Sequence, residues 1–259
     1  MDHEGIKRHF PILEFDPDPR AILEPSAGKL EAPIPERMVG CFFREVHEKL
    51  LAGGQLTPMG YVASEMGHNP VYRLEYQGKQ VMTYMPGLGA PLAGGWLDEV
   101  IAGGVTKAMI CGGCGALLPE LVMGHPVVVT AAVRDEGTSY HYLAPSREVT
   151  SDGRGMAALE AALTARGVPY SLGKTWTTDG FYRETAAKRQ LRVDEGCSVV
   201  EMEASAMIAV AQARKIALGY LLYAGDLVVP DGWDLRDWRN NKSVRELLFW
   251  LCVDAVCRL

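Results

Sequence analysis

The sequence lacks the features that would place it in a membrane or on nucleic acid. No uninterrupted apolar run approaches the roughly 20 residues that a membrane-spanning helix needs. The stretch MDHEGIKRHFP has no basic region followed by an apolar one, so we expect no secretory signal. Positive charge is in deficit, with 26 Lys and Arg against 32 Asp and Glu and a net charge of −6. A mildly acidic protein has no electrostatic attraction to nucleic acid or to an anionic membrane surface.

Metal-binding spacing is lacking as well. The six cysteines include a Cys-x-x-Cys pair, Cys111 and Cys114, with no second pair and no histidine at ligand spacing from it. A redox role would require a thioredoxin-like setting, which the surrounding sequence does not resemble. Most of the cysteines lie in apolar stretches, which is typical of reduced, buried thiols. We therefore expect a cytoplasmic location, no metal and no organic cofactor.

What is present is a chain of 259 residues, 48% hydrophobic, in which strand and helix patterns alternate. Residues 1–35 are rich in proline and acids and are predicted to form an N-terminal arm that wraps a neighbour. Residues 36–259 are predicted to form a single α/β domain with a mixed sheet covered on both faces. The expected helices span 44–54, 96–104, 156–166, 201–214 and 243–259. The expected strands include a hairpin over 71–85 that turns at Gln77-Gly78, and the segments 107–111, 125–133 and 217–225.

A glycine-rich stretch, GGCGA at 112–116, follows the predicted strand 107–111. Small residues at the carboxyl end of a strand expose backbone N–H groups where open α/β sheets bind ligands. We interpret this stretch as a ligand-facing turn in which the cysteines occupy small-residue positions. A tight turn without a ligand is the alternative.

Several motifs occur in an order that resembles a known family. The segment KAMICGGCGALLPELVMGHPVVVTAAVRDEGTSYHYLAP is similar to the centre of the nucleoside phosphorylase superfamily, which includes hexameric purine nucleoside phosphorylases and uridine phosphorylases. MPGLGAPLAG precedes it, and TTDGFY, VVEMEASAM and YAGD follow it, over residues 38–230. The resemblance implies a three-layer αβα domain with a central mixed, partly barrel-like sheet. It also implies a homodimer or a homohexamer built as a trimer of dimers.

The implied activity is cleavage of the N-glycosidic bond of a nucleoside by phosphate, giving free base and ribose 1-phosphate. An aspartate in YAGD favours a purine nucleoside. The alternatives are a nucleosidase that uses water, a uridine phosphorylase, and a homologue that binds nucleosides without turnover.

By resemblance, the sugar and the leaving base are served by acidic residues. Glu203 would accept hydrogen bonds from the ribose hydroxyls and stabilise a cationic transition state, with Met202 and Glu201 beside the sugar. Both glutamates are expected to stay ionised near a helix start. Asp226 would hydrogen-bond purine N7 as the base departs. Ordinary first-turn and turn positions are the alternative explanation for these acids.

Further contacts are implied around the substrate. The base would stack on Phe181 and Tyr182, and backbone groups of Gly113, Cys114 and Gly115 would line the substrate site. His9 of the arm would reach the sugar 5′ end in a neighbouring subunit, with His3 as the alternative histidine.

Phosphate binding is implied for Gly40, Arg44 and Gly113, and Gly89 is a further candidate. The sequence departs from the family pattern here. Cys41-Phe42 replaces Asp-Pro, and Ile110 stands where phosphorylases carry an arginine. Ile110 cannot bind phosphate in a bidentate manner, and this is what motivates the hydrolytic alternative. We considered Arg134 and Arg73 as replacements.

Overall fold

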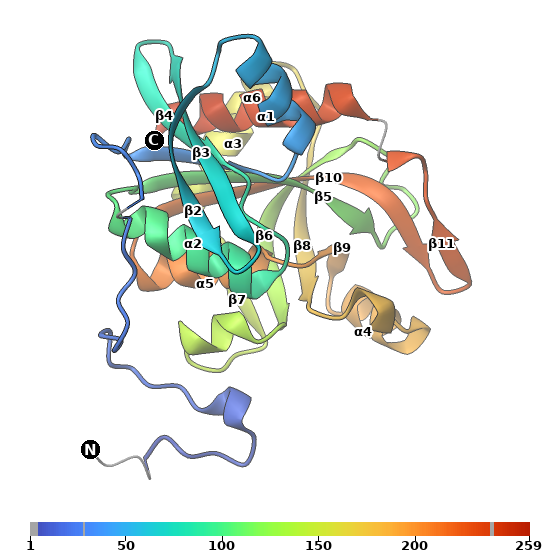
Figure 1. Ribbon diagram of the computed structural model, residues 1–259. Helices are drawn as coiled ribbons and strands as arrows, with labels where there is room; N and C mark the ends of the chain where they lie inside the picture. Colours follow the sequence, from blue (N-terminus) through green and yellow to red (C-terminus); the bar gives the residue numbers. More distant parts are fainter. Residues whose placement is uncertain (1–4, 28, 239–240) are drawn as a thin grey trace.

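The computed structural model describes residues 5–27, 29–238 and 241–259 (Figure 1). The strands are β1 (Arg37–Cys41), β2 (Thr57–Ser64), β3 (Gly67–Tyr76), β4 (Lys79–Tyr84), β5 (Lys107–Ala116), β6 (Pro126–Asp135), β7 (Glu148–Thr150), β8 (Ser171–Thr178), β9 (Cys197–Glu201), β10 (Ala217–Val229) and β11 (Gly232–Asp234). The α-helices are α1 (Arg44–Ala52), α2 (Ala90–Ala102), α3 (Gly153–Ala165), α4 (Ala186–Asp194), α5 (Ala204–Ala213) and α6 (Lys242–Arg258). Short 3₁₀ helices are η1 (Pro11–Leu13), η2 (Thr138–His141) and η3 (Phe181–Arg183).

The described strands form one 11-stranded mixed sheet in the order β11-β10-β6-β8-β9-β5-β1-β4-β3-β2, with β7 beside β6. Strand β10 pairs with both β6 and β5. Because β6, β8, β9 and β5 are themselves joined in series, these five strands close into a barrel. The predicted mixed, partly barrel-like sheet is therefore confirmed.

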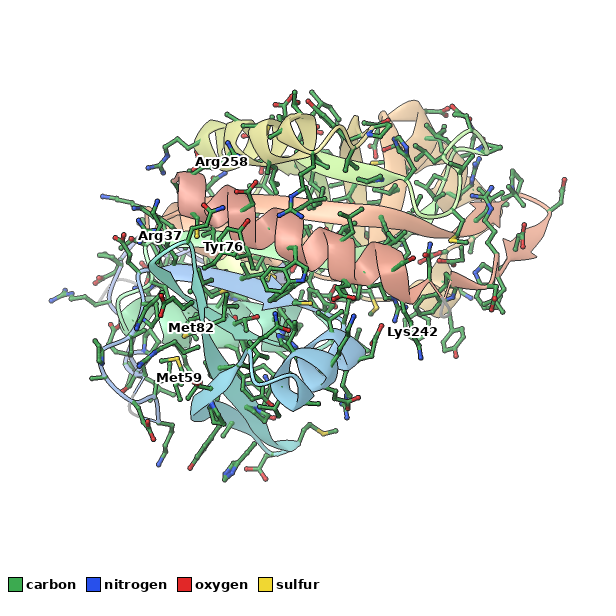
Figure 2. The ribbon with its side chains drawn as sticks, turned by 90° about the horizontal axis from the view of Figure 1, so that it is seen from above. Arg37, Met59, Tyr76, Met82, Lys242 and Arg258 are labelled. Atoms are coloured by element: carbon green, nitrogen blue, oxygen red, sulfur yellow. The ribbon has the colours of Figure 1, made fainter. Side chains whose placement is uncertain are left out.

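Helices cover both faces of the sheet (Figure 1). On one face, α1, α3 and α6 enclose a core that includes Phe249 and Leu163, and on the other, α2 and α5 enclose a core that includes Leu97 and Met207. Figure 2 shows α6 crossing the sheet from Lys242 to Arg258, with Tyr76 near the Arg258 end. The three-layer prediction is confirmed, and no helix among the described residues is long and apolar enough to cross a membrane.

The predicted hairpin turn is correct in detail. Gln77 and Gly78 both have positive φ, 51° and 74°, as a two-residue turn between β3 and β4 requires. The predicted helix over 201–214 begins too early. Glu201 ends strand β9, Glu203 is the N-cap, and α5 begins at Ala204.

The predicted glycine turn is wrong. Residues 112–116 continue strand β5, pairing with β10 and then with β9. Glycine serves close packing here, because a side chain at Gly113 would meet the Tyr223 ring at 3.2 Å. At Gly115 it would meet Val200 at 3.0 Å.

The segment before β1 is extended, and within residues 5–27 its helical part is η1. It meets the domain where Leu30 bridges Gly60 and Arg73 donates to the Pro33 carbonyl at 2.8 Å. Ile22 and Leu23 of this arm are fully exposed or nearly so. Wrapping of a neighbour and the boundary at residue 35 stay predictions.

Candidate active site

One edge of strand β5 is left open at the barrel. Strand β1 pairs with β5 as far as Cys111, and β9 pairs with it from Gly115. Residues 112–114 between them pair with neither β1 nor β9. Backbone groups on this edge can face a ligand, so the predicted roles of Gly113, Cys114 and Gly115 keep a physical basis although the turn itself does not exist.

Glu203 lies beside this opening, at the junction of β9 and α5. Its carboxylate is buried and accepts a hydrogen bond from the Gly89 N–H at 2.6 Å. Gly89 has φ 87°, a conformation that favours glycine and turns its N–H toward the carboxylate. The Gly89 N–H is thus engaged by Glu203, whereas the sequence suggested that it binds phosphate.

Glu201 points into the protein and is fully engaged there. One carboxylate oxygen accepts from the Thr177 and Thr175 hydroxyls at 2.6 and 3.2 Å. The other accepts from the backbone N–H groups of Glu203 and Ala204 at 2.7 and 2.6 Å. With four donors on two oxygens, Glu201 caps α5 and leaves little capacity for a ribose hydroxyl. Its predicted direct contact with substrate does not fit this geometry.

Electrostatics differ from the expected pair of ionised glutamates. Burial raises the pKa of Glu203 to about 8, and repulsion from Glu201 adds to this effect. Burial also raises the pKa of Glu201, although four hydrogen bonds oppose the shift. Desolvation therefore outweighs the helix dipole that the sequence suggested. Met202, between the two glutamates, is half-buried.

Asp226 lies on the other side of β5, in the distal part of β10. It is half-buried, and its carboxylate accepts from the Trp233 indole N–H at 2.5 Å. A side chain at Gly115 would stand 3.7 Å from its other oxygen, which places Asp226 next to the glycine stretch. The chain thus carries one carboxyl group, Glu203, after β9 and another, Asp226, on β10.

The aromatic pair Phe181 and Tyr182 forms η3, directly after β8. The two rings lie 4.2 Å apart between centroids, and their side chains are 49% and 89% exposed. This exposure separates them from core aromatics and leaves their faces available for stacking. Glu184, which sequence reasoning missed, is the C-cap residue of η3, and burial together with the charge of Asp226 raises its pKa to about 7.

Gly40 and Arg44 lie at the end of β1 and the start of α1. A side chain at Gly40 would collide with Ile110 at 2.7 Å and Pro86 at 2.9 Å, so Ile110 fills the space beside Gly40 with apolar atoms. Arg44 is exposed and makes no hydrogen bond or ion pair with the part of the chain that the structure describes. Its guanidinium is available for an anion.

The two replacement arginines are occupied elsewhere. Arg134 is buried and donates to Ser139, Ser146 and the Ala144 carbonyl at 2.7–2.8 Å. Arg73 holds the arm through the Pro33 carbonyl. Neither fits the phosphate role considered from sequence.

Arg245 of α6 is a cation near the β1 end that sequence reasoning missed. It pairs with Glu45 at 2.5 Å, donates to the Tyr223 hydroxyl at 3.0 Å, and lies 5.3 Å from the ring centroid of Phe43. Its position three residues into α6 carries no sequence signal, because only the fold brings α6 and α1 together.

The remaining candidates are His9 of the arm and the thiols of Cys111 and Cys114. His9 packs edge-on against Phe10, with ring centroids 4.5 Å apart, and His3 is outside the described residues. Burial raises the pKa of the Cys111 and Cys114 thiols, which is opposite to what a nucleophilic or redox cysteine needs.

The chain is similar to known proteins in both sequence and fold. A family model described as the phosphorylase superfamily matches residues 52–246. Guanosine phosphorylase of Halorubrum lacusprofundi is 28% identical over 176 residues, which cover 67% of this chain and 73% of the relative. Uridine phosphorylase of Escherichia coli is 25% identical over 202 residues, which cover 73% and 79%. The crystal structure of uridine phosphorylase from Vibrio fischeri has the same fold, with a TM-score of 0.75 at 20% identity over 93% of this chain and 100% of that one.

Proposed function

Because the chain belongs to the phosphorylase superfamily, an enzyme family, we propose that it cleaves the N-glycosidic bond of purine nucleosides with phosphate. The products are the free base and ribose 1-phosphate, and inorganic phosphate is the co-substrate, with no metal or organic cofactor. The observation that carries this proposal is the pair of carboxyl groups, Glu203 after β9 and Asp226 on β10, on the two sides of strand β5.

Glu203 serves the sugar in this mechanism. As the glycosidic bond lengthens, the ribose acquires oxocarbenium character, and the ionised form of Glu203, which its pKa of about 8 makes the minor form at pH 7, stabilises the positive charge. The same carboxylate accepts hydrogen bonds from the ribose hydroxyls, and the Gly89 N–H fixes its orientation at 2.6 Å. Burial strengthens both interactions because water does not screen them.

Asp226 serves the leaving base. A protonated carboxyl group at this point can donate a hydrogen bond, or its proton, to purine N7, an atom that a pyrimidine ring lacks. The guanosine phosphorylase among the relatives supports a purine substrate, and the uridine phosphorylases keep a pyrimidine as the second candidate. Phe181 and Tyr182 supply exposed ring faces for the base.

Arg44 supplies the charge for phosphate, since its guanidinium is exposed and uncommitted among the described residues. Hydrolysis is a second candidate reaction because the apolar Ile110 side chain fills the space beside Gly40. The two reactions differ in one product, ribose 1-phosphate or free ribose.

The test is a chromatographic assay of inosine, guanosine, adenosine, methylthioadenosine and uridine, each with and without phosphate. We expect purine release that requires phosphate, and we expect Arg44→Ala to raise the KM for phosphate by about tenfold or more, since charged hydrogen bonds are lost. The control is Arg154→Ala. It removes an exposed arginine of α3 that forms an ion pair with Asp152.

Each other outcome has a definite meaning. Free ribose released at the same rate without phosphate would replace phosphorolysis by hydrolysis. Cleavage of uridine alone would overturn the purine assignment. An unchanged KM for phosphate in Arg44→Ala would remove Arg44 from the site, and no release from any nucleoside would favour a binding protein.

A further inference from the structure

Glu184 has an unusual position for an acidic side chain. It is the C-cap residue of η3, so it follows the exposed aromatic pair Phe181 and Tyr182 and precedes the N-cap of α4. Glu184 is half-buried, yet its carboxyl group makes no hydrogen bond or ion pair with any residue in the described ranges. Partial burial of a carboxyl group without a partner costs free energy, and a ligand that brings N–H donors would recover it.

The surroundings of Glu184 fix which ligand group it can meet. The charge of Asp226 acts on Glu184, and Arg189 of α4 donates to the Val228 carbonyl of β10 at 3.1 Å, so the start of α4 lies beside the part of β10 that carries Asp226. Lys188 of α4 is the cation that opposes this effect. The Lys188 ammonium is committed to Asp135 at 2.8 Å, so it does not neutralise Glu184.

The chemistry of the purine bases then selects among substrates. A carboxylate offers two acceptors side by side and matches two adjacent N–H donors. Guanine presents such a pair, ring N1–H and the exocyclic 2-amino group. Hypoxanthine presents N1–H alone, and adenine presents an acceptor at N1, which repels a carboxylate.

We propose that Glu184 selects 2-amino-6-oxopurine nucleosides of the guanosine type by accepting hydrogen bonds from N1–H and the 2-amino group. This inference rests on the proposed function, in which Asp226 engages N7 of the same base. Glu184 is then a specificity residue, whereas Glu203 and Asp226 carry out bond cleavage.

The experiment compares Glu184→Gln with the unmodified enzyme on guanosine, inosine and adenosine in the presence of phosphate. Glutamine keeps the shape but replaces one acceptor by a donor. We expect kcat/KM for guanosine to fall about tenfold or more, for inosine to fall less, and for adenosine to stay within about threefold. Asp194→Asn is the matched control, because Asp194 is an exposed acid on α4 that contacts Gln190.

A second measurement is independent of turnover. Equilibrium dialysis of free guanine and free adenine should show that Glu184→Gln and Glu184→Asp lose affinity for guanine and keep their affinity for adenine. A guanosine-to-adenosine ratio and a guanine affinity that are both unchanged within about twofold would overturn the role of Glu184. If the unmodified enzyme cleaves no purine nucleoside, the proposed function fails, and guanine binding alone decides on Glu184.

Discussion

At the scale of single residues, Glu203 sets activity against stability. A carboxyl group whose pKa is about 8 in the folded protein and near 4.5 in the unfolded chain makes the fold less stable as pH rises between those values. Glu203→Gln removes this cost and can still accept from the Gly89 N–H. We expect the variant to lose catalysis and to gain several degrees in Tm, on the order of 2–4 °C per kcal/mol.

Thermal unfolding at pH 5, 7 and 9 measures this effect. The gain in Tm should be small at pH 5, where the folded enzyme holds the proton, and largest at pH 9. A Glu203→Gln variant that is less stable than the unmodified enzyme at pH 9, or that keeps its activity, would contradict the assignment.

Glu184 adds a pH dependence to the choice of base. Burial and Asp226 raise its pKa to about 7, while Lys188 opposes the shift. Below pH 7 the protonated carboxyl group loses one acceptor, so the preference for guanosine over adenosine should decline as pH falls from 8 to 6. Ratios of kcat/KM across this range test the prediction, and Glu184→Gln should give a flat ratio.

At the scale of elements, the junction between β9 and α5 depends on Glu201. Its carboxylate accepts both N–H groups at the start of α5 and two hydroxyl groups from β8. In Glu201→Gln the amide NH₂ would face donors, so we expect a lower Tm and a higher KM for nucleoside as Glu203 loses its position. The two isosteric changes, at Glu201 and Glu203, should therefore shift Tm in opposite directions at pH 8, and a shared direction would contradict this account.

Sequence patterns predicted some of these elements correctly and others not. The Gln77-Gly78 turn was predictable because local backbone conformation alone demands those residues. The stretch 112–116 was misjudged as a turn. Its glycines are required because Tyr223 and Val200, which are distant in sequence, leave no space for a side chain. The hydrogen bonds of Glu201 were not predictable for the same reason, since its donors Thr175 and Thr177 belong to another strand.

At the scale of the whole molecule, the fold was predictable from the order of motifs, and the closure of the barrel agrees with it. The contents of the site were less predictable. Glu184 lies outside the motifs that resemble the family. Arg245 binds Glu45, which is 200 positions away in the sequence. Only the folded chain brings such pairs together.

The N-terminal arm is the feature of the whole molecule that calls for a partner. Ile22 and Leu23 are exposed, and Phe10 is 58% exposed, which a second copy of the chain would cover. We expect light scattering to show a dimer or hexamer, and deletion of residues 1–24 to reduce the assembly or raise the KM for nucleoside. A deletion variant with an unchanged number of subunits and unchanged kinetics would contradict an intersubunit arm.

The closed barrel has an evolutionary consequence. Asp226 lies on a barrel strand and Glu203 directly follows another, whereas η3 and Glu184 lie in the connection between β8 and α4. A connection can accept substitutions that a closed ring of strands cannot. Descendants of this chain could therefore acquire new base preferences by changing that connection alone, while inheriting the bond-breaking apparatus intact.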